Sequence, residues 1–147
     1  MMTDVEKVEE SLRQSPFDTW IGFHVIEVHS GSVVLEFHNE GETWCNPNHT
    51  VHGGVLYSMA DSAMGAACSV LGKSTLTLEL SMNYYLPTLP DSTIRAVAKV
   101  THNGKSMMSG ICDFYDEQKR YLAHGTGAYF VTGAVAASGE KGCVDHG

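Results

Sequence analysis

Apolar and polar residues alternate along much of this chain, and one long segment breaks that pattern. Residues 53–72 form an almost continuous apolar run that ends at Gly72, which is typical of a buried helix with a glycine at its C-terminal end. Period-two alternation on either side of this run predicts strands. The predicted strands are residues 24–29, 32–39, 74–86, 93–102, 105–116 and 119–132.

The start of the chain predicts a short helix. Thr3 is a suitable N-cap for residues whose apolar positions recur at helical spacing, and Pro16 ends this helix within residues 1–16. The aromatic and apolar stretch that follows is expected to lean on the core. We expect residues 1–132 to form a single domain and residues 133–147, which are rich in glycine, alanine and serine, to form a flexible tail.

Short turns join the strands that follow the long helix, and Asn103-Gly104 is a strong hairpin signal. That part of the sheet is therefore predicted to be antiparallel. A helix that is apolar nearly all round must be covered by other elements. The sequence thus predicts an α+β fold in which an antiparallel sheet wraps around one long central helix.

Composition narrows the classes of function. With 43% apolar residues among 147, a packed core is expected, and the net charge of −8 argues against a nucleic-acid partner. Asp61 and several serines interrupt the apolar run at residues 53–72, so a buried helix is favoured over a membrane span. No targeting segment is recognised at the N-terminus, and the four cysteines are scattered. A cytoplasmic protein with reduced thiols is therefore expected.

The loop at residues 40–52 leads into the most informative motif, His52-Gly53-Gly54 at the start of the long helix. Backbone N–H groups have no partner in the first turn of a helix, and glycines let a ligand approach them closely. Those donors, with the positive end of the helix dipole, suit a carbonyl oxygen that becomes an oxyanion. Alternatively, the glycines only permit a sharp turn from loop to helix.

Asp61 is the only charged residue between His52 and Lys73. A buried carboxylate without a partner is costly, so Asp61 is either a structural residue bonded to a hydroxyl or a functional base or nucleophile. It lies about 12 Å along the helix from Gly53. If both groups act on one carbonyl, Asp61 must come from a second subunit, which predicts a site shared across a two-fold axis.

Two further residues near the helix start have alternative interpretations. Asn46 is either a ligand for water or substrate, or a turn-forming residue before a proline. His52 is either an acid or base, or a structural residue that fixes the loop, and we favour the latter.

A metal site is the main rival chemistry. Cys45, His49 and His52 form a cluster to which Cys143 and His146 add further candidate ligands. This spacing fits none of the common zinc patterns. We therefore expect no metal.

The combination of Asn46, His52-Gly53-Gly54 and Asp61 resembles the signature of hotdog-fold acyl-CoA thioesterases of the phenylacetate-degradation type. The resemblance covers residues 17–131. It implies that the Gly53 N–H polarises the thioester carbonyl, with Gly54 beside it, and that Asp61 of the partner subunit is the base or nucleophile. Asn46 would orient the attacking water or the thioester, and His52 would brace the loop.

The resemblance also implies where coenzyme A lies. The turn residues lie near its phosphates and nucleotide in similar proteins, and Tyr85 is placed along the CoA channel. The matching turn is Asn103, Gly104, Lys105 and Ser106. Relatives often carry a serine or threonine on the strand after the helix, and an ungapped count from Asp61 puts Glu79 there. Thr77 and Ser81 would be its neighbours on the same face.

These observations predict an acyl-CoA thioesterase, a dimer or a dimer of dimers (homotetramer), that needs no bound organic cofactor beyond the CoA of its substrate. One alternative is a non-catalytic acyl-CoA binding module, for which Glu79 in the site would be the distinguishing feature. Another is a hotdog-type hydratase or dehydratase. That chemistry favours an Asp and a His a few residues apart, and no histidine follows Asp61 before His102.

Overall fold

The computed structural model describes residues 1–135, and these form three helices and one six-stranded sheet. The elements are α1 (Asp4–Arg13), α2 (Pro16–Ile21), β1 (His24–His29), β2 (Ser32–His38), α3 (Gly53–Val70), β3 (Lys73–Tyr84), β4 (Thr93–Asn103), β5 (Met107–Tyr115) and β6 (Tyr121–Ala134). The strand order is β1-β2-β4-β5-β6-β3, and every neighbouring pair is antiparallel. The predicted α+β class is confirmed.

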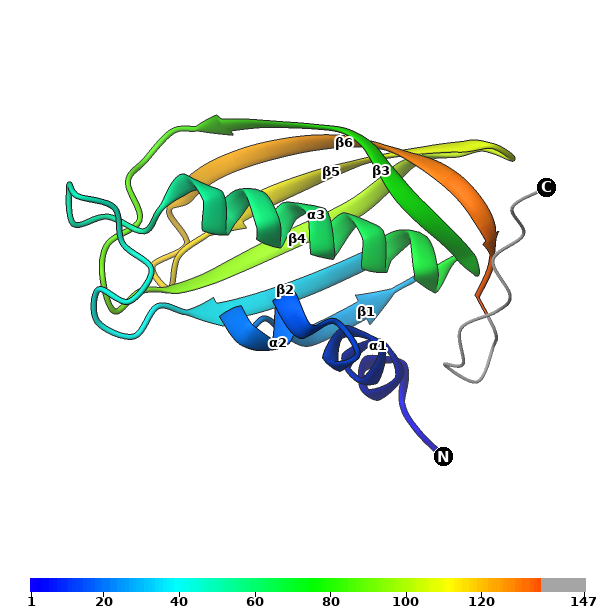
Figure 1. Ribbon diagram of the computed structural model, residues 1–147, viewed down its shortest axis with the longest axis horizontal. Helices are drawn as coiled ribbons and strands as arrows, with labels where there is room; N and C mark the ends of the chain where they lie inside the picture. Colours follow the sequence, from blue (N-terminus) through cyan, green and yellow to red (C-terminus); the bar gives the residue numbers. More distant parts are fainter. Residues whose placement is uncertain (136–147) are drawn as a thin grey trace.

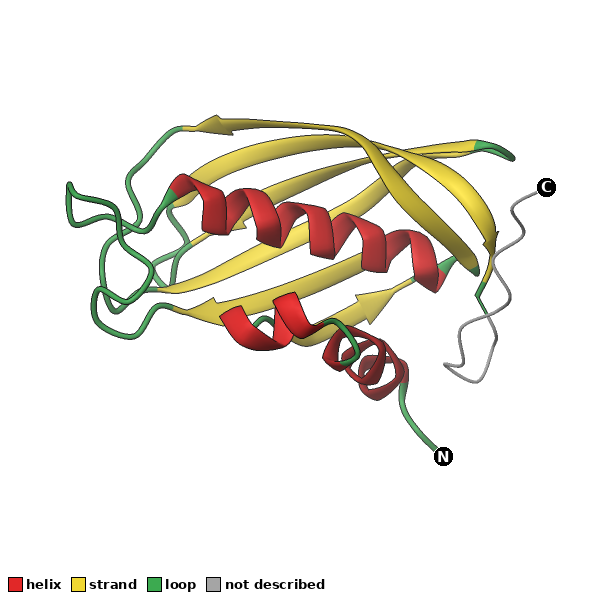
Figure 2. Ribbon diagram, viewed as in Figure 1, coloured by secondary structure: helices red, strands yellow, loops and turns green. Residues whose placement is uncertain are grey.

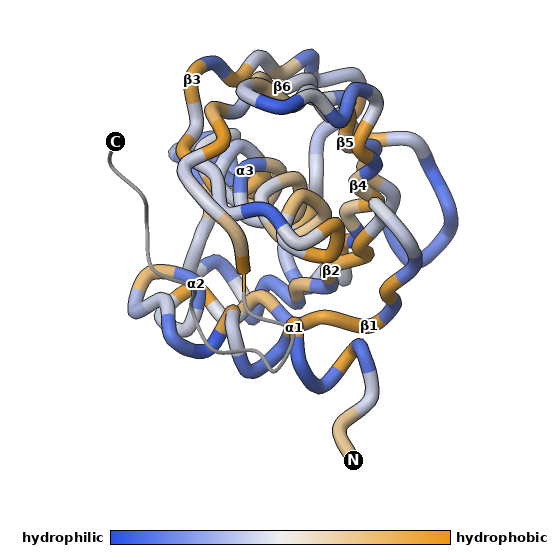
Figure 3. Tube along the Cα trace, turned by 90° about the vertical axis from the view of Figure 1, so that its right-hand side faces the viewer, coloured by the Kyte–Doolittle hydropathy of each residue, from blue (hydrophilic) through white to orange (hydrophobic). Residues whose placement is uncertain are grey.

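The sheet curves around α3, and α1 and α2 lie beside its β1–β2 end (Figures 1 and 2). Seen along its axis in Figure 3, α3 lies in the hollow of the sheet. Met59, Ala60 and Ala63 on α3 are fully buried, and so are most large side chains on the inner face of β2. The sheet therefore supplies the cover that an apolar helix requires.

One face of α3 stays open in the single chain, contrary to the expectation that the helix is covered all round. Gly54 and Tyr57 are exposed there, and Ser58 and Asp61 are half-buried. These positions recur every three or four residues, so they form one stripe along the helix. Asp61 therefore lies on a surface that this chain does not cover by itself.

The N-terminal region contains two helices where the sequence predicted one. Thr3 caps α1 in a capping box with Glu6, as its sequence position predicted. Pro16 does not follow the end of a single helix but begins α2, because a proline at the first helical position loses no hydrogen bond. Asp18 on α2 is buried and accepts a hydrogen bond of 2.5 Å from Ser62 of α3, which fastens α2 beside the central helix.

The C-terminal strand is longer than predicted. β6 continues to Ala134, because Gly133 and Ala134 pair with Ser74 and Lys73 of β3. The predicted tail therefore begins no earlier than residue 135, and the rest of it lies outside the described residues. None of the helices within residues 1–135 has the length and apolar character needed to cross a lipid bilayer.

Leu35 on β2 gives a direct test of this packing. Its side chain is 0% exposed between the sheet and α3. We expect Leu35→Ala to lower the free energy of unfolding by about 2–5 kcal/mol, because it leaves a cavity in the core. Urea denaturation measures this change. Glu36→Ala, at the adjacent position with an exposed ion pair to Arg95, is the control and should cost less than about 1 kcal/mol. Equal losses for the two variants would contradict the assigned faces of β2.

Candidate active site at the central helix

The start of α3 holds one backbone donor without an acceptor. His52 is the N-cap, and its Nδ1 accepts a hydrogen bond of 2.8 Å from the Gly54 N–H. The Gly53 N–H has no hydrogen-bond acceptor within residues 1–135. Of the two glycines, Gly53 therefore offers the free donor, while the N–H of Gly54 is already used.

His52 also fixes the loop that precedes the helix. Its backbone N–H donates to the Trp44 carbonyl at 2.8 Å, and the Val51 N–H donates to the Thr88 carbonyl at 2.8 Å. A Cβ at position 54 would lie 2.9 Å from His52 Nδ1, so the glycine allows this close approach. These contacts are the ones that a bracing role for His52 requires.

Tyr84, which the sequence analysis did not single out, holds the same helix end from β3. Its hydroxyl donates to the Gly53 carbonyl at 2.6 Å. Burial, followed by the neighbouring Tyr57, raises the pKa of Tyr84, so the hydroxyl stays a donor at neutral pH. A pocket of about 390 Å³ opens beside these two residues, and Asn46 and Tyr85 contribute to its wall.

Asn46 is held inside its own loop. Its Nδ2 donates to Thr50 Oγ1 at 2.9 Å, and its Oδ1 accepts from the backbone N–H groups of Asn48 and Thr50 at 2.9 and 3.2 Å. This is the turn-forming arrangement that the sequence allowed. An amide nitrogen carries two hydrogens, so one N–H remains for a ligand in the pocket that Asn46 lines.

The Asp61 carboxylate accepts hydrogen bonds from two hydroxyl groups. Thr77 Oγ1 on β3 donates to Asp61 Oδ1 at 2.7 Å, and the Tyr129 hydroxyl on β6 lies 3.1 Å from the same oxygen. Sequence reasoning missed Tyr129, since it is far from Asp61 in the chain and lies in an ordinary alternating strand. α3 is unbroken between Gly53 and Asp61, so the two remain about 12 Å apart along the axis.

A β-bulge decides which residues of β3 face the site. Thr77 pairs with Tyr129, but Glu79 pairs with Ala128, so Leu78 is an extra residue in the strand. Directly paired residues share a face of the sheet, and Tyr129 faces α3. Thr77 therefore faces Asp61, while Glu79 lies on the opposite face.

The predicted position of Glu79 in the site is therefore wrong. The prediction assumed that side chains alternate without interruption along β3, so that Thr77 and Glu79 would share a face, and the extra residue Leu78 breaks that alternation. Ser81 likewise lies on the outer face, where it is exposed and pairs with the exposed Thr126. On this part of β3 the side chains that pack toward the core are Leu80 and Met82. Thr77 is the one residue of the predicted trio that contacts Asp61.

The predicted CoA turn lies at the other end of the molecule from Gly53. The tip of the β4–β5 hairpin and the N-terminus of α3 are at opposite ends of the sheet in Figure 1. Lys73, at the start of β3, donates to Asn103 Oδ1 at 2.5 Å and to the Gly104 carbonyl at 2.7 Å. Lys105 and Ser106 are exposed beside it. Within one chain, the turn and Gly53 therefore do not line one compact site.

The residues of the rival metal site do not converge. Among residues 1–135, no group of three or more His, Cys, Asp or Glu side chains is placed to hold a metal ion. His49 pairs with Glu42 at 2.5 Å, and His52 is used as the helix cap. Cys143 and His146 lie outside the described residues.

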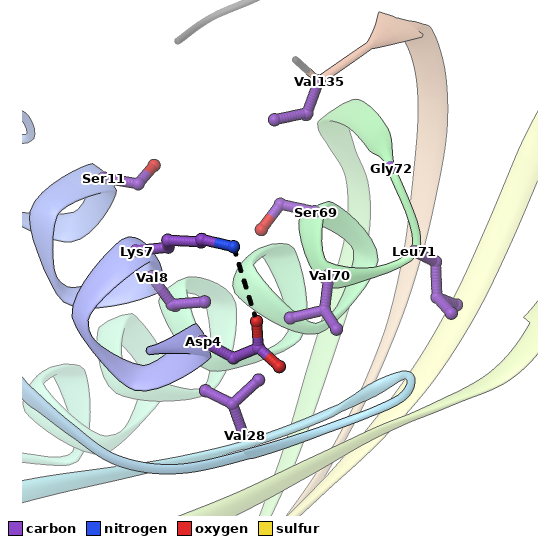
Figure 4. Close-up of a pocket in the computed structure, with 10 residues that line it drawn as sticks. All are labelled: Asp4, Lys7, Val8, Ser11, Val28, Ser69, Val70, Leu71, Gly72 and Val135. Carbon is purple, nitrogen blue, oxygen red and sulfur yellow. Dashed lines mark ion pairs between the residues drawn. The ribbon is translucent and has the colours of Figure 1, made fainter. Parts of the chain in front are cut away.

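A second pocket, of about 440 Å³, lies between α1 and the C-terminal end of α3 (Figure 4). Val8, Val28 and Val70 contribute to its apolar wall, and the Asp4–Lys7 ion pair of 3.8 Å lies at its edge. None of the candidate site residues lines it. The candidate site residues therefore lie away from this pocket.

The helix-start amide and the hydrogen-bonded aspartate lie on one central helix, and comparison with known proteins establishes the class to which this chain belongs. The sequence model of the thioesterase superfamily matches residues 48–123, a span of more than half of the 147 residues that includes Gly53, Asp61 and Thr77. The chain belongs to the thioesterase superfamily. The hotdog fold and the resemblance inferred from the sequence are confirmed.

Individual relatives agree with this assignment. The acyl-coenzyme A thioesterase PaaI of Escherichia coli (strain K12) is 25% identical over 103 residues, which is 70% of this chain and 73% of that protein. The solved structure of the E. coli PaaI protein from the phenylacetic acid degradation operon superimposes with a TM-score of 0.80 at 21% identity, covering 90% of this chain and 98% of that one. A hypothetical thioesterase from Streptococcus pneumoniae, solved with coenzyme A, superimposes with a TM-score of 0.79 at 22% identity, covering 85% and 97%. These two structures show the same fold.

The cap at the start of α3 gives a prediction that is independent of activity. His52→Ala leaves the Gly54 N–H without its acceptor, and we expect the free energy of unfolding to fall by about 1 kcal/mol. His52→Asn is the matched control, because asparagine is a strong N-cap, and it should retain most of the stability. Thermal or denaturant unfolding of the three proteins measures this difference. An alanine variant as stable as wild type would show that the cap contributes nothing.

Proposed function

We propose that this protein hydrolyses acyl-CoA thioesters to the free acid and coenzyme A. The observation that carries the proposal is the pairing of a free Gly53 N–H at a helix start with an Asp61 carboxylate fixed by Thr77 on the open face of the same helix. Membership of the thioesterase superfamily supports it, as does the likeness to an acyl-coenzyme A thioesterase. With Glu79 on the outer face, the feature that favoured a non-catalytic binding module is gone.

The Gly53 N–H suits the thioester carbonyl oxygen. As the carbonyl carbon becomes tetrahedral, that oxygen gains negative charge, which the amide and the helix dipole stabilise. Asp61 acts either as a base that takes a proton from the attacking water or as the nucleophile itself. Asn46 has one free amide hydrogen that orients water or the thioester. Tyr84 and His52 hold the helix start that carries the Gly53 N–H. The carbon–sulfur bond then breaks and releases CoA.

If Gly53 and Asp61 act on the same carbonyl, the distance along α3 calls for a second copy of the chain. Gly53 and Asp61 of one helix are about 12 Å apart, too far for one carbonyl to contact both. β3 is an edge strand whose Leu76 and Leu78 are 66% and 56% exposed, and edge strands with apolar side chains are templates for pairing. Two β3 strands paired about a two-fold axis would set the open faces of the two α3 helices antiparallel. Gly53 of each subunit would then lie opposite Asp61 of the other.

The same arrangement gives a place for coenzyme A. The hairpin turn at Lys105 is remote from Gly53 within a chain (Figure 1). A two-fold partner would bring its own turn toward that end. Lys73 and Lys105 then supply local positive charge for the phosphates in a protein of net charge −8. Tyr85 would line the channel between the two ends. We propose a cytoplasmic dimer or dimer of dimers with no bound organic cofactor.

Thiol release tests the activity. A panel of aliphatic and aromatic acyl-CoAs should give turnover with the wild-type protein, and Asp61→Asn should lower kcat by at least about a hundredfold. Glu79→Gln is the matched control, because that carboxylate lies on the outer face and its loss should leave kcat unchanged. The best substrate gives the acyl class. Bound CoA without release from any thioester would overturn the hydrolase proposal.

Mixing two inactive variants tests whether the site is shared. Gly53→Pro removes the proposed donor while keeping a residue favoured at the first helical position, and Gly53→Ala is the control that keeps the N–H. Neither Gly53→Pro nor Asp61→Asn should be active alone. Subunits exchanged at equal ratio should regain about a quarter of wild-type activity, since half of the dimers are mixed and each has one intact site. No recovery on verified exchange would place both groups in the same chain's site.

A further inference from the structure

The two oxygens of the Asp61 carboxylate have different surroundings. Thr77 Oγ1 donates to Oδ1 at 2.7 Å, and the Tyr129 hydroxyl lies 3.1 Å from Oδ1 and 3.3 Å from the Asp61 backbone carbonyl. Asp61 Oδ2 has no hydrogen-bond partner within the described part of the chain. One oxygen is therefore held from two strands, and the other is free.

Tyr129 is fixed by the fold as well as by Asp61. Its side chain is 1% exposed and belongs to the core cluster around α3. Gly127, two residues earlier on the same face of β6, leaves room for the ring, because a Cβ there would lie 2.8 Å from Tyr129 Cε2. A buried tyrosine hydroxyl needs a polar partner, and Asp61 is the partner that this packing provides.

The hydroxyl of Tyr129 stays protonated, so it remains a donor. Burial is the main cause that raises the pKa of Tyr129, followed by the negative charge of Asp61 and the hydrogen bond to it. Tyr129 thus sets the orientation of the Asp61 carboxylate from inside the core.

We propose that Tyr129 is a positioning residue for the hydrolysis: with Thr77 it holds Asp61 Oδ1, which leaves Oδ2 as the oxygen that acts on the substrate. This inference rests on the proposed thioesterase activity. It adds a residue that lies outside the span matched by the superfamily model, residues 48–123.

The role holds for either chemistry of Asp61. As a base, Oδ2 takes a proton from water while the water oxygen bonds to the carbonyl carbon. The carbon–sulfur bond then breaks, and the CoA sulfur leaves with its electron pair and receives that proton. As a nucleophile, Oδ2 bonds to the carbonyl carbon and CoA leaves as a thiolate that takes a proton from solvent. Water then cleaves the anhydride, which releases the acid and restores Asp61. Both routes need one carboxylate oxygen fixed and the other free.

Removing the hydroxyl of Tyr129 tests the proposal. Tyr129→Phe keeps the ring and its packing, so we expect kcat to fall by about tenfold to a hundredfold with KM within about twofold of wild type. Tyr121→Phe is the matched control on the same strand, since its hydroxyl donates to the Asp113 carboxylate at 2.5 Å. That control should keep wild-type kcat. In each variant kcat is calculated per folded protein, because a loss of folded protein would also lower the apparent kcat with KM unchanged.

A second variant keeps the test independent of how well Tyr129→Phe folds. Gly127→Ala retains the hydroxyl but crowds the ring of Tyr129, and it should lower kcat in the same direction with KM unchanged. Wild-type kcat in both variants, with Asp61→Asn inactive, would overturn the role of Tyr129 and leave the thioesterase standing. A wild-type protein that turns over no acyl-CoA would overturn both proposals.

Discussion

The need to bury the apolar side chains of helix α3 determines the rest of this structure. Such a helix cannot be solvated, so the sheet curves around it and buries residues such as Met59 and Ala63 completely. The same packing leaves one stripe of α3 uncovered, and Asp61 lies on it. A polar group on a helix of this kind must find partners in the surrounding strands, and Thr77 and Tyr129 provide them. The fold and the fixation of the carboxylate thus follow from one constraint.

The length of the helix has a second consequence. The donor at Gly53 and the carboxylate at Asp61 are separated by about 12 Å of rigid helix, which no loop movement can shorten. An unbroken helix therefore keeps the two groups apart, and in the proposed dimer they belong to different sites. The exposed apolar edge of β3 beside the open face gives a physical route to the second half. The proposed assembly and the proposed chemistry are linked through the same two elements, α3 and β3.

The bulge at Leu78 shows how strongly a local irregularity affects a site. Side chains alternate along a strand, so one extra residue exchanges the inner and outer faces beyond it. The exchange removes a second carboxylate, Glu79, from the vicinity of Asp61 and leaves the hydroxyl of Thr77 there. Asp61 therefore lies beside two hydroxyl donors, those of Thr77 and Tyr129, and not beside a second carboxylate.

The sequence by itself determined the class of fold, the extent of α3 and the two features on which the proposed site rests, the His52-Gly53-Gly54 motif and Asp61. These features depend on periodicity, on the one charge in an apolar run and on the special backbone of glycine, all of which are local. Only the tertiary structure decided that the Gly54 N–H donates a hydrogen bond to His52 and that Pro16 begins a second helix. It also decided that Thr77, and not Glu79, faces Asp61. Tyr129 likewise reaches Asp61 only through the pairing of β6 with β3. Strand register and packing between distant segments leave no local signal in the chain, because they arise from contacts that exist only once the sheet has formed.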